Sequence, residues 1–159
     1  MKKRTSLIFF PGLMIGMMLM CQCTAQDQIE FRIDEDKQQV EVLIDGELFT
    51  SYIYPQQIKK TVLWPVISNG GNMLTRSYPL VIKEGDRTDH PHHVGVWFNY
   101  GDVNGYDFWN NSSAVPRERK GAYGRIVHRS VEQLESQGST GVLKVRMDWM
   151  APDNEQAEK

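Results

Sequence analysis

Three of the four histidines of the chain stand within four positions, in the segment Asp-His-Pro-His-His at residues 89–93. An imidazole has an ordinary pKa near ~6.5, so it can both accept and donate a proton at neutral pH. We predict that His93 and His128 form a proton-transfer pair, in which one ring acts as base and the other as acid. This pairing requires the strand around His128 to lie next to the segment that follows His93.

The segment after the histidines predicts how His93 is presented. Residues 94–100 have the period of a strand, in which successive side chains point to opposite faces. The predicted core face holds Val94, Val96 and Phe98, and the opposite face holds His93, Gly95, Trp97 and Asn99. A polar and aromatic face is typical of sugar binding, because an indole can cover the apolar side of a pyranose ring while polar groups bond its hydroxyls. The alternative is that Trp97 only covers a second sheet.

His90 and His92 flank Pro91, and the residue before a proline is biased toward extended backbone. In an extended segment their rings share a face, so we expect them to bind the substrate or to position the proton-transfer pair. A divalent transition metal such as copper or zinc is the alternative ligand, since both metals bind neutral imidazole. His90 and His92 would then hold the metal, although the zinc spacing His-Glu-x-x-His is absent. No cofactor is assigned, and a purely structural role of these histidines stays open.

Oxygen-bearing side chains follow, and Asp102, Asn104 and Asp107 are further candidate ligand-binding residues. Their spacing starts like a calcium loop, but Gly105 stands at the fourth position instead of the sixth. Ser113 stands where an EF-hand requires a bidentate glutamate. The segment is therefore predicted to be a turn of residues that tolerate left-handed backbone. We expect Asp102 or Asp107 to fix the tautomer of an imidazole.

The elements that must hold these side chains are strands. Alternation at 29–33 is followed by an apolar run at 40–44, by the pair Asp45-Gly46 and by a return strand at 47–53, which together predict a hairpin. Two further segments follow, residues 58–64 up to a break at Pro65 and residues 73–82, and the other predicted strands are residues 94–100, 124–132 and 142–149. We expect an all-β fold, an antiparallel β-sandwich. After Met150 only a polar tail remains, so the sandwich is expected to be incomplete at its C-terminus.

The first residues have the layout of a secretory signal peptide, which we assign to residues 1–25. Cations at 2–4 precede an apolar stretch at 7–20, and small residues end at Ala25, where we expect cleavage. The apolar stretch is shorter than the ~20 residues of a membrane-spanning helix, so no span is expected in the mature chain. The protein is therefore predicted to be exported to the periplasm or the cell surface. Lipid attachment at Cys21 or Cys23 is the alternative.

Charge narrows the range of partners. The chain has 18 Lys and Arg against 20 Asp and Glu, a net charge of −2, and loss of residues 1–25 would remove more cations. Without a basic stripe no nucleic-acid partner is expected, because binding there depends on neutralising phosphates. The predicted partner is a small-molecule or glycan substrate, and the sequence carries no signal of oligomeric state. Both cysteines lie within the predicted signal peptide, so the mature chain would contain no disulfide.

Three segments carry a resemblance to a known family: Leu-Thr-Arg-Ser-Tyr-Pro-Leu at 74–80, the stretch 89–109, and Gly-Arg-Ile-Val-His at 124–128. Together they resemble a bacterial family of exported proteins catalogued as "methane oxygenase PmoA". The resemblance covers roughly residues 40 to 150, and it implies that residues 26–159 are the N-terminal portion of a longer PmoA-like domain. It also implies a sandwich similar to the mutarotase-like supersandwich. Methane oxidation is not expected, since a membrane oxygenase subunit needs several apolar spans of ~20 residues.

These observations leave three hypotheses for function. The first is a carbohydrate-active enzyme, an epimerase, lyase or hydrolase, that uses histidines for acid–base chemistry on a sugar. The second is a non-catalytic carbohydrate-binding module with the same surface. The third is a copper-binding protein that uses the histidine cluster. Fold resemblance alone does not choose among them, because one fold supports many activities.

Overall fold

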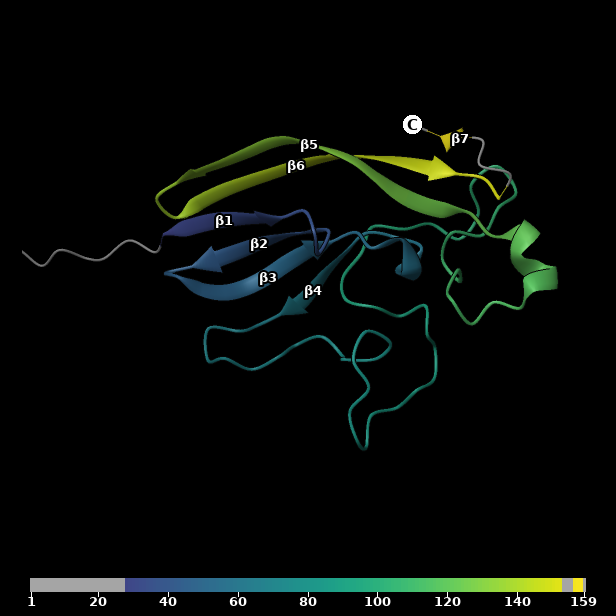
Figure 1. The fold of residues 1–159 in the computed structure, drawn as a ribbon, viewed down its shortest axis with the longest axis horizontal. Helices are drawn as coiled ribbons and strands as arrows, with labels where there is room; N and C mark the ends of the chain where they lie inside the picture. Colours follow the sequence, from purple (N-terminus) through teal and green to yellow (C-terminus); the bar gives the residue numbers. More distant parts are fainter. Residues whose placement is uncertain (1–27, 153–155, 159) are drawn as a thin grey trace, which may run out of the picture.

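A computed structural model describes residues 28–152 and 156–158, which form an all-β protein of two antiparallel sheets (Figure 1). The first sheet has the order β1-β2-β3-β4, with β1 at Ile29–Asp34, β2 at Gln39–Ile44, β3 at Glu47–Ile53 and β4 at Val62–Val66. The second has the order β5-β6-β7, with β5 at Arg125–Gln137, β6 at Thr140–Met150 and β7 at Gln156–Glu158. Two short 3₁₀ helices are η1 at Gln56–Ile58 and η2 at Arg117–Ala122. The prediction of an all-β, antiparallel fold is confirmed.

Local turn chemistry builds the centre of the first sheet. Asp45 has φ 53° and Gly46 has φ 82°, the left-handed backbone that a tight two-residue hairpin requires at both positions. The Asp45 carboxylate also accepts a hydrogen bond of 2.8 Å from the backbone N–H of Gln28. The predicted hairpin of β2 and β3 is thus confirmed.

The fourth strand differs from its prediction. The segment 58–64 was expected to end at a break at Pro65, but β4 begins at Val62 and runs through Pro65 to Val66. Proline is tolerated because β4 is the last strand of its sheet, where a missing N–H does not interrupt a ladder between two strands. Ile58 ends η1, and Lys59 follows it with φ 64°, which turns the chain before β4.

The predicted strand at 94–100 is wrong. Gly95 has φ 56°, which breaks the alternation of side chains, and the segment makes only an isolated bridge between Leu63 and Val96. The predicted core face fails with it, since Val96 is 52% exposed and Phe98 is 78% exposed, whereas Val94 is buried. Residues 73–82 are irregular apart from a bridge between Met73 and Ile67.

The second sheet is a long hairpin of β5 and β6 that lies alongside β1 in Figure 1. Its strands are longer than the predicted 124–132 and 142–149, because pairing continues to the bridge between Gln137 and Thr140. The Ile29 N–H donates to the Gly138 carbonyl at 3.1 Å, which links β1 to the hairpin turn. The expectation of only a polar tail after Met150 is wrong, since β7 pairs with the end of β6.

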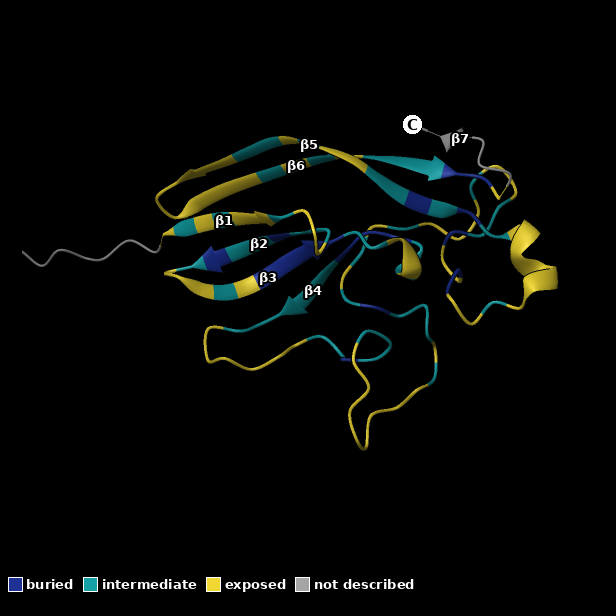
Figure 2. Cartoon of the chain, viewed as in Figure 1, coloured by how far each residue is buried: buried dark blue, intermediate teal, exposed yellow. Residues whose placement is uncertain are grey.

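The core that supports the site joins the first sheet to the loops after β4. Ile53 and Val62 pack with Val94, and Trp97 lies against this cluster. Figure 2 shows the buried parts of β2 and β3 and the buried start of β5, while the loops are largely intermediate or exposed. Since Val94 directly follows the histidines, this core fixes where the histidines lie.

Predictions on residues 1–25, including Ala25, Cys21 and Cys23, fall outside the described residues. Within residues 28–152 and 156–158, no helix has the length and apolarity required to span a membrane.

Candidate functional site

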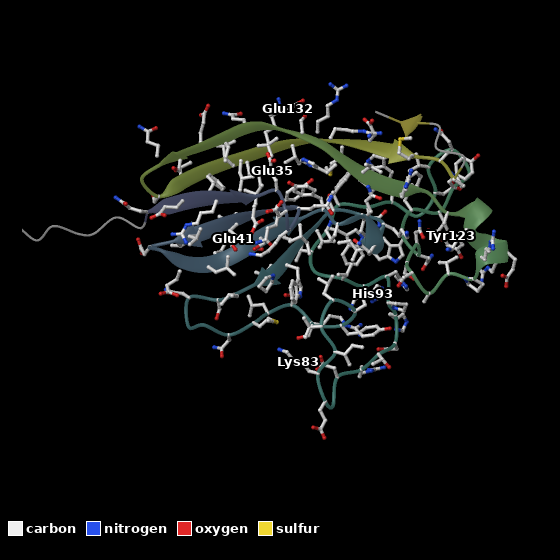
Figure 3. All side chains as sticks on the ribbon, in the orientation of Figure 1. Glu35, Glu41, Lys83, His93, Tyr123 and Glu132 are labelled. Atoms are coloured by element: carbon white, nitrogen blue, oxygen red, sulfur yellow. The ribbon has the colours of Figure 1, made fainter. Side chains whose placement is uncertain are left out.

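Backbone contacts with β4 position the histidine cluster, which we define as His90, His92 and His93. Val96 exchanges two backbone hydrogen bonds with Leu63, of 2.8 and 3.0 Å, so the segment after the cluster is held against the edge strand. Figure 3 shows His93 among the loops that follow β4. The histidines are therefore mounted on a loop that the sheet anchors.

The backbone of His90 departs from the extended conformation expected before Pro91. It has φ 50°, and its carbonyl accepts a hydrogen bond of 2.9 Å from the His93 N–H, which closes a turn. This turn overrides the extended bias before proline and brings His90 toward His93 instead of alongside His92. The prediction that His90 and His92 share a face of an extended segment is wrong.

The three imidazoles of the cluster contact one another. The rings of His90 and His93 are stacked, with centroids 5.0 Å apart and planes 16° apart. His92 meets His93 edge-on at 4.3 Å, and His90 at 5.7 Å. Three titratable groups at these separations must influence one another's protonation.

Asp89 is the carboxylate that bonds to the cluster. Its Oδ2 lies 2.8 Å from His90 Nδ1 and 2.9 Å from Arg87 Nη2, and its Oδ1 lies 3.8 Å from Arg76 Nη2. The hydrogen bond with His90 and the charges of Arg87, His90 and Arg76 hold the pKa of Asp89 below its usual value, against partial burial. An ionised carboxylate can only accept, so Nδ1 of His90 carries the proton and Nε2 is left free.

The tautomer role that we expected for Asp102 or Asp107 thus belongs to Asp89. Asp102 accepts the Gly105 N–H at 2.9 Å, and Asp107 accepts both the backbone and the side-chain N–H groups of Asn110. Each carboxylate is engaged in its own turn. Asn104 and Gly105 both have positive φ, at 54° and 84°, so the predicted turn is confirmed.

A cavity of about 440 Å³ opens beside the cluster. Its lining contains two arginines, two aspartates, two histidines and a tyrosine, namely Arg76, Arg87, Asp86, Asp89, His90, His93 and Tyr78. Arg76 is held in place, because its Nη2 donates to the carbonyls of Arg87 and Asp89 at 2.6 and 3.0 Å. Cations and carboxylates are balanced in this lining, which suits a polar ligand without a large net charge.

Indole rings adjoin His93 on another side. Trp97 lies 6.1 Å and Trp109 lies 6.4 Å from the imidazole, and the two indoles are 5.5 Å apart. Trp109 is 41% exposed, whereas Nε1 of Trp97 is buried without a hydrogen-bond partner. The side chain of Asn99 donates to the Phe108 carbonyl at 3.0 Å. The predicted sugar-binding face thus retains Trp97 and His93, and Asn99 connects two loops.

Lys60 lies beneath the cluster, although it is only 2% exposed. Its Nζ donates to the carbonyl of Trp109 at 2.8 Å and to that of His92 at 3.4 Å, and lies 5.0 Å from the centre of the Trp97 ring. Burial lowers the pKa of Lys60 to about 8, while the charge of Asp107 acts in the opposite direction. One ammonium therefore ties the histidine loop to the loop that carries Trp109.

The surroundings favour neutral imidazoles in two of the three histidines. Partial burial, and then the charges of His90, Arg76 and Lys60, lower the pKa of His93, against the opposing charge of Asp89. The pKa of His92 is lowered by partial burial, His93, Lys60 and His90, with Asp107 opposing. At neutral pH these two rings are available to accept protons.

His128 does not join this cluster. It lies on β5, which pairs with β6 and not with the segment after His93, so the neighbour relation that the predicted pair required is wrong. The ring of His128 stacks on Tyr54 at 4.1 Å and shares a hydrogen bond of 3.1 Å between its Nδ1 and the Tyr52 hydroxyl. Burial lowers its pKa. His93 and His128 line different cavities.

The family of the chain follows from a comparison of its sequence. A family model described as "Family of unknown function (DUF6807)" matches residues 39–158, most of the chain. The chain belongs to this family. No curated protein and no solved structure matches it. The match to DUF6807 does not test the resemblance to the family named PmoA, which stays a prediction.

In this DUF6807 chain, sequence reasoning missed three site residues: Lys60, Arg76 and Asp89. A lysine inside the apolar run at 58–64 and an aspartate directly before His90 were available signals. Arg76 gave no signal of its own, because its contact with Asp89 depends on the loop fold. As to a metal, no three His, Cys, Asp or Glu side chains converge as a metal-binding group within the described part of the DUF6807 chain.

Proposed function

We propose that the protein is an exported carbohydrate-active enzyme in which His93 and His90 move protons on a neutral, hydroxyl-rich sugar. The reaction class is that of an epimerase, a lyase or a hydrolase. The observation that carries the proposal is the pair of stacked imidazoles, 5.0 Å apart, on the wall of one cavity. Such rings can act on one bound molecule, one as base and the other as acid.

His93 is the proposed base. Its lowered pKa favours the neutral ring, which has a lone pair for the proton of a substrate C–H or O–H group. When His93 accepts that proton, the new positive charge lies near the carboxylate of Asp89. The negative charge of Asp89 raises the pKa of His93 and so opposes the effect of burial. The charge is therefore partly compensated.

His90 is the proposed acid. Asp89 holds its Nδ1 at 2.8 Å, so the ring is oriented and an imidazolium there would be ion-paired. This is the role that a carboxylate plays when it orients an imidazole and stabilises its charged form. In that imidazolium Nε2 also carries a proton, which it can deliver to the substrate while Nδ1–H stays bonded to Asp89. His90 thus replaces His128 in the acid role, because His90 lines the same cavity as His93.

The surroundings support a sugar as the substrate. The exposed ring of Trp109 and the neighbouring Trp97 offer an aromatic surface beside His93. The balanced charge of the cavity lining favours a neutral ligand over a strongly anionic one. The layout of residues 1–25 supports export, and N-terminal sequencing of protein recovered outside the cytoplasm would check cleavage after Ala25.

The test uses a panel of neutral glycosides in deuterated water, with products followed by mass spectrometry. We expect turnover or deuterium incorporation with at least one glycoside. His93→Ala and His90→Ala should each lower the rate by at least ~10²-fold, the contribution of a typical general acid or base. The matched control is His128→Ala, which removes an imidazole outside the cavity and should leave the rate within a few-fold of the wild type.

Two outcomes would reject the enzyme proposal. Near-normal rates in both cluster variants would exclude His93 and His90 as the proton-transfer groups. Binding of a glycoside without any turnover, with weakened binding in His93→Ala alone, would instead identify a non-catalytic binding module.

A further inference from the structure

Two further cavities adjoin each other, and neither lining contains His90, His92 or His93. One, of about 290 Å³, is lined by residues that include Tyr54, Lys59, Arg125 and Arg129. The other, of about 280 Å³, is lined by residues that include Lys59, Lys120 and Arg125. Because Lys59 and Arg125 belong to both linings, we treat the two cavities together as one cationic groove, defined by Lys59, Lys60, Lys120, Arg125 and Arg129.

The backbone brings these cations together from three elements. Lys59 follows η1 with φ 64°, and its carbonyl accepts a hydrogen bond of 3.0 Å from the N–H of Ile126 at the start of β5. This bond places Arg125 beside Lys59. Lys120 lies in η2, which precedes β5, and the Tyr123 side chain near it is labelled in Figure 3.

The groove has a charge opposite to that of the chain. Among the residues that the structure describes, no aspartate or glutamate lines either cavity, whereas the whole chain has a net charge of −2. Arg129 is paired with Asp148 at 2.6 Å, and Lys60 is bonded to two carbonyls. For Lys59 and Lys120, by contrast, no ion pair is recorded within the described part of the chain. A concave surface with such uncompensated cations concentrates anions.

The shape of the groove narrows the class of anion. Two adjoining cavities suit a ligand of repeated units better than a single small ion. The wall of the first cavity is aromatic, because Tyr54 stacks on His128 at 4.1 Å. Nucleic acid fits less well, since it requires a broadly basic domain and this chain has a pI near 6.1.

We propose that the cationic groove binds an acidic oligosaccharide, a chain of sugar units that carry carboxylates. Lys59, Lys120 and Arg125 pair with the carboxylates, and the Tyr54 side of the groove covers the apolar face of one unit. This site is separate from the cavity at His93, and its existence does not depend on catalysis there.

Isothermal titration of the intact chain with trigalacturonate tests the proposal. We expect binding that weakens as salt is added, and no comparable binding of neutral maltotriose. The double variant Lys59→Gln, Lys120→Gln should bind at least about tenfold more weakly, since it removes two charged hydrogen-bond donors from the groove. Glutamine is tolerated at the backbone of Lys59, because Gln38 has φ 54° in this fold.

The matched control is Lys83→Gln, Lys144→Gln, which removes the same charge elsewhere; Figure 3 shows Lys83 on a loop far from Tyr123. This control should bind trigalacturonate with an affinity within about twofold of the wild type. His93→Ala should also keep this affinity, so that a failure of the catalytic proposal can be told apart from a failure of this one. The inference is overturned if the wild type does not bind trigalacturonate at low salt or if both double variants lose binding equally. Tighter binding of a single-stranded oligonucleotide than of trigalacturonate would also overturn it.

Discussion

Asp89 joins three side chains of the site, although the sequence did not lead us to select it. One carboxylate bonds to His90 and to Arg87 and lies near Arg76, so it orients an imidazole and positions two cations of the same cavity. The low pKa of Asp89 keeps it ionised through the neutral range. If the proposed reaction is correct, its pH dependence should report the histidines and not this aspartate.

Lys60 provides a prediction about stability and pH. Its pKa in the folded protein is about 8, lowered from 10.5 by burial, so the unfolded chain binds this proton more tightly. Below about pH 8 the buried ammonium of Lys60 therefore lowers the free energy of unfolding by its full amount. This destabilisation disappears as pH rises toward 10.5. The free energy of unfolding should rise over this window by on the order of 3 kcal/mol, at 1.36 kcal/mol per pKa unit.

The ionisation of Tyr52 limits the rise in the free energy of unfolding at its high-pH end. Burial raises its pKa to about 12, so above pH 10 the folded state retains a proton that the unfolded state loses, and stability falls. Urea unfolding between pH 7 and 10 checks the rise, and Lys60→Met should remove it. The control Lys83→Met changes an exposed lysine and should keep the slope. A flat profile in the wild type would contradict the assigned burial of the Lys60 charge.

At the scale of elements, the contact between the histidine loop and β4 depends on a glycine. Gly95 has φ 56°, and a Cβ at this position would overlap the carbonyl of Leu63. We expect Gly95→Ala to destabilise the protein by about 2 kcal/mol or more, because it adds both backbone strain and a collision. The bridge between Leu63 and Val96 should be lost, and with it the placement of His93.

Thermal unfolding and the two-dimensional NMR signals of the imidazoles measure this effect. Gly101→Ala is the control, since no atom lies within 4 Å of a Cβ at Gly101. Equal melting temperatures for the two variants would show that the loop does not need the close approach to β4.

The same elements show what the sequence could predict. Asp45 and Gly46 dictate their hairpin locally, and the paired strands β5 and β6 follow from their alternation. The strand at 94–100 failed because Gly95 takes a left-handed backbone where the chain approaches Leu63, a residue distant in sequence. Alternation detects side chains that fit a strand, but it does not detect whether another strand is available to pair with them.

The candidate site, like the fold, could be predicted from the sequence only in part. The proximity of the three clustered histidines follows from their spacing, and their contacts agree with it. The partner of His93 did not follow, since it depended on which strand lies next to residues 94–100. Neither did the role of Lys60, because its carbonyl acceptors at His92 and Trp109 belong to loops that only the fold brings together.

For the whole molecule, the contact between the two sheets depends on another glycine. A Cβ at Gly141 on β6 would lie 2.6 Å from Cγ2 of Ile29 and 2.9 Å from Cζ of Phe31, both on β1. We expect Gly141→Ala to separate the β5–β6 hairpin from β1 and to lower the free energy of unfolding by roughly 1–3 kcal/mol. Hydrogen exchange of the Ile29 amide, which bonds to Gly138, should become faster.

The control for this prediction is Gly121→Ala in η2, where a Cβ would meet no atom within 4 Å. It should leave both the melting temperature and the Ile29 exchange rate unchanged. Unaltered exchange at Ile29 in Gly141→Ala would mean that the two sheets hold together without this contact.

The proximity of Trp97, Trp109 and His93 also has an optical consequence. Two indoles 5.5 Å apart are close enough for their excited states to couple, which should produce a paired positive and negative signal in far-ultraviolet circular dichroism. A protonated imidazole quenches a neighbouring indole, so the emission of these two tryptophans should rise as His93 loses its proton. The cluster therefore carries its own chromophores, and both its protonation and a sugar bound at Trp109 should be visible without any added label.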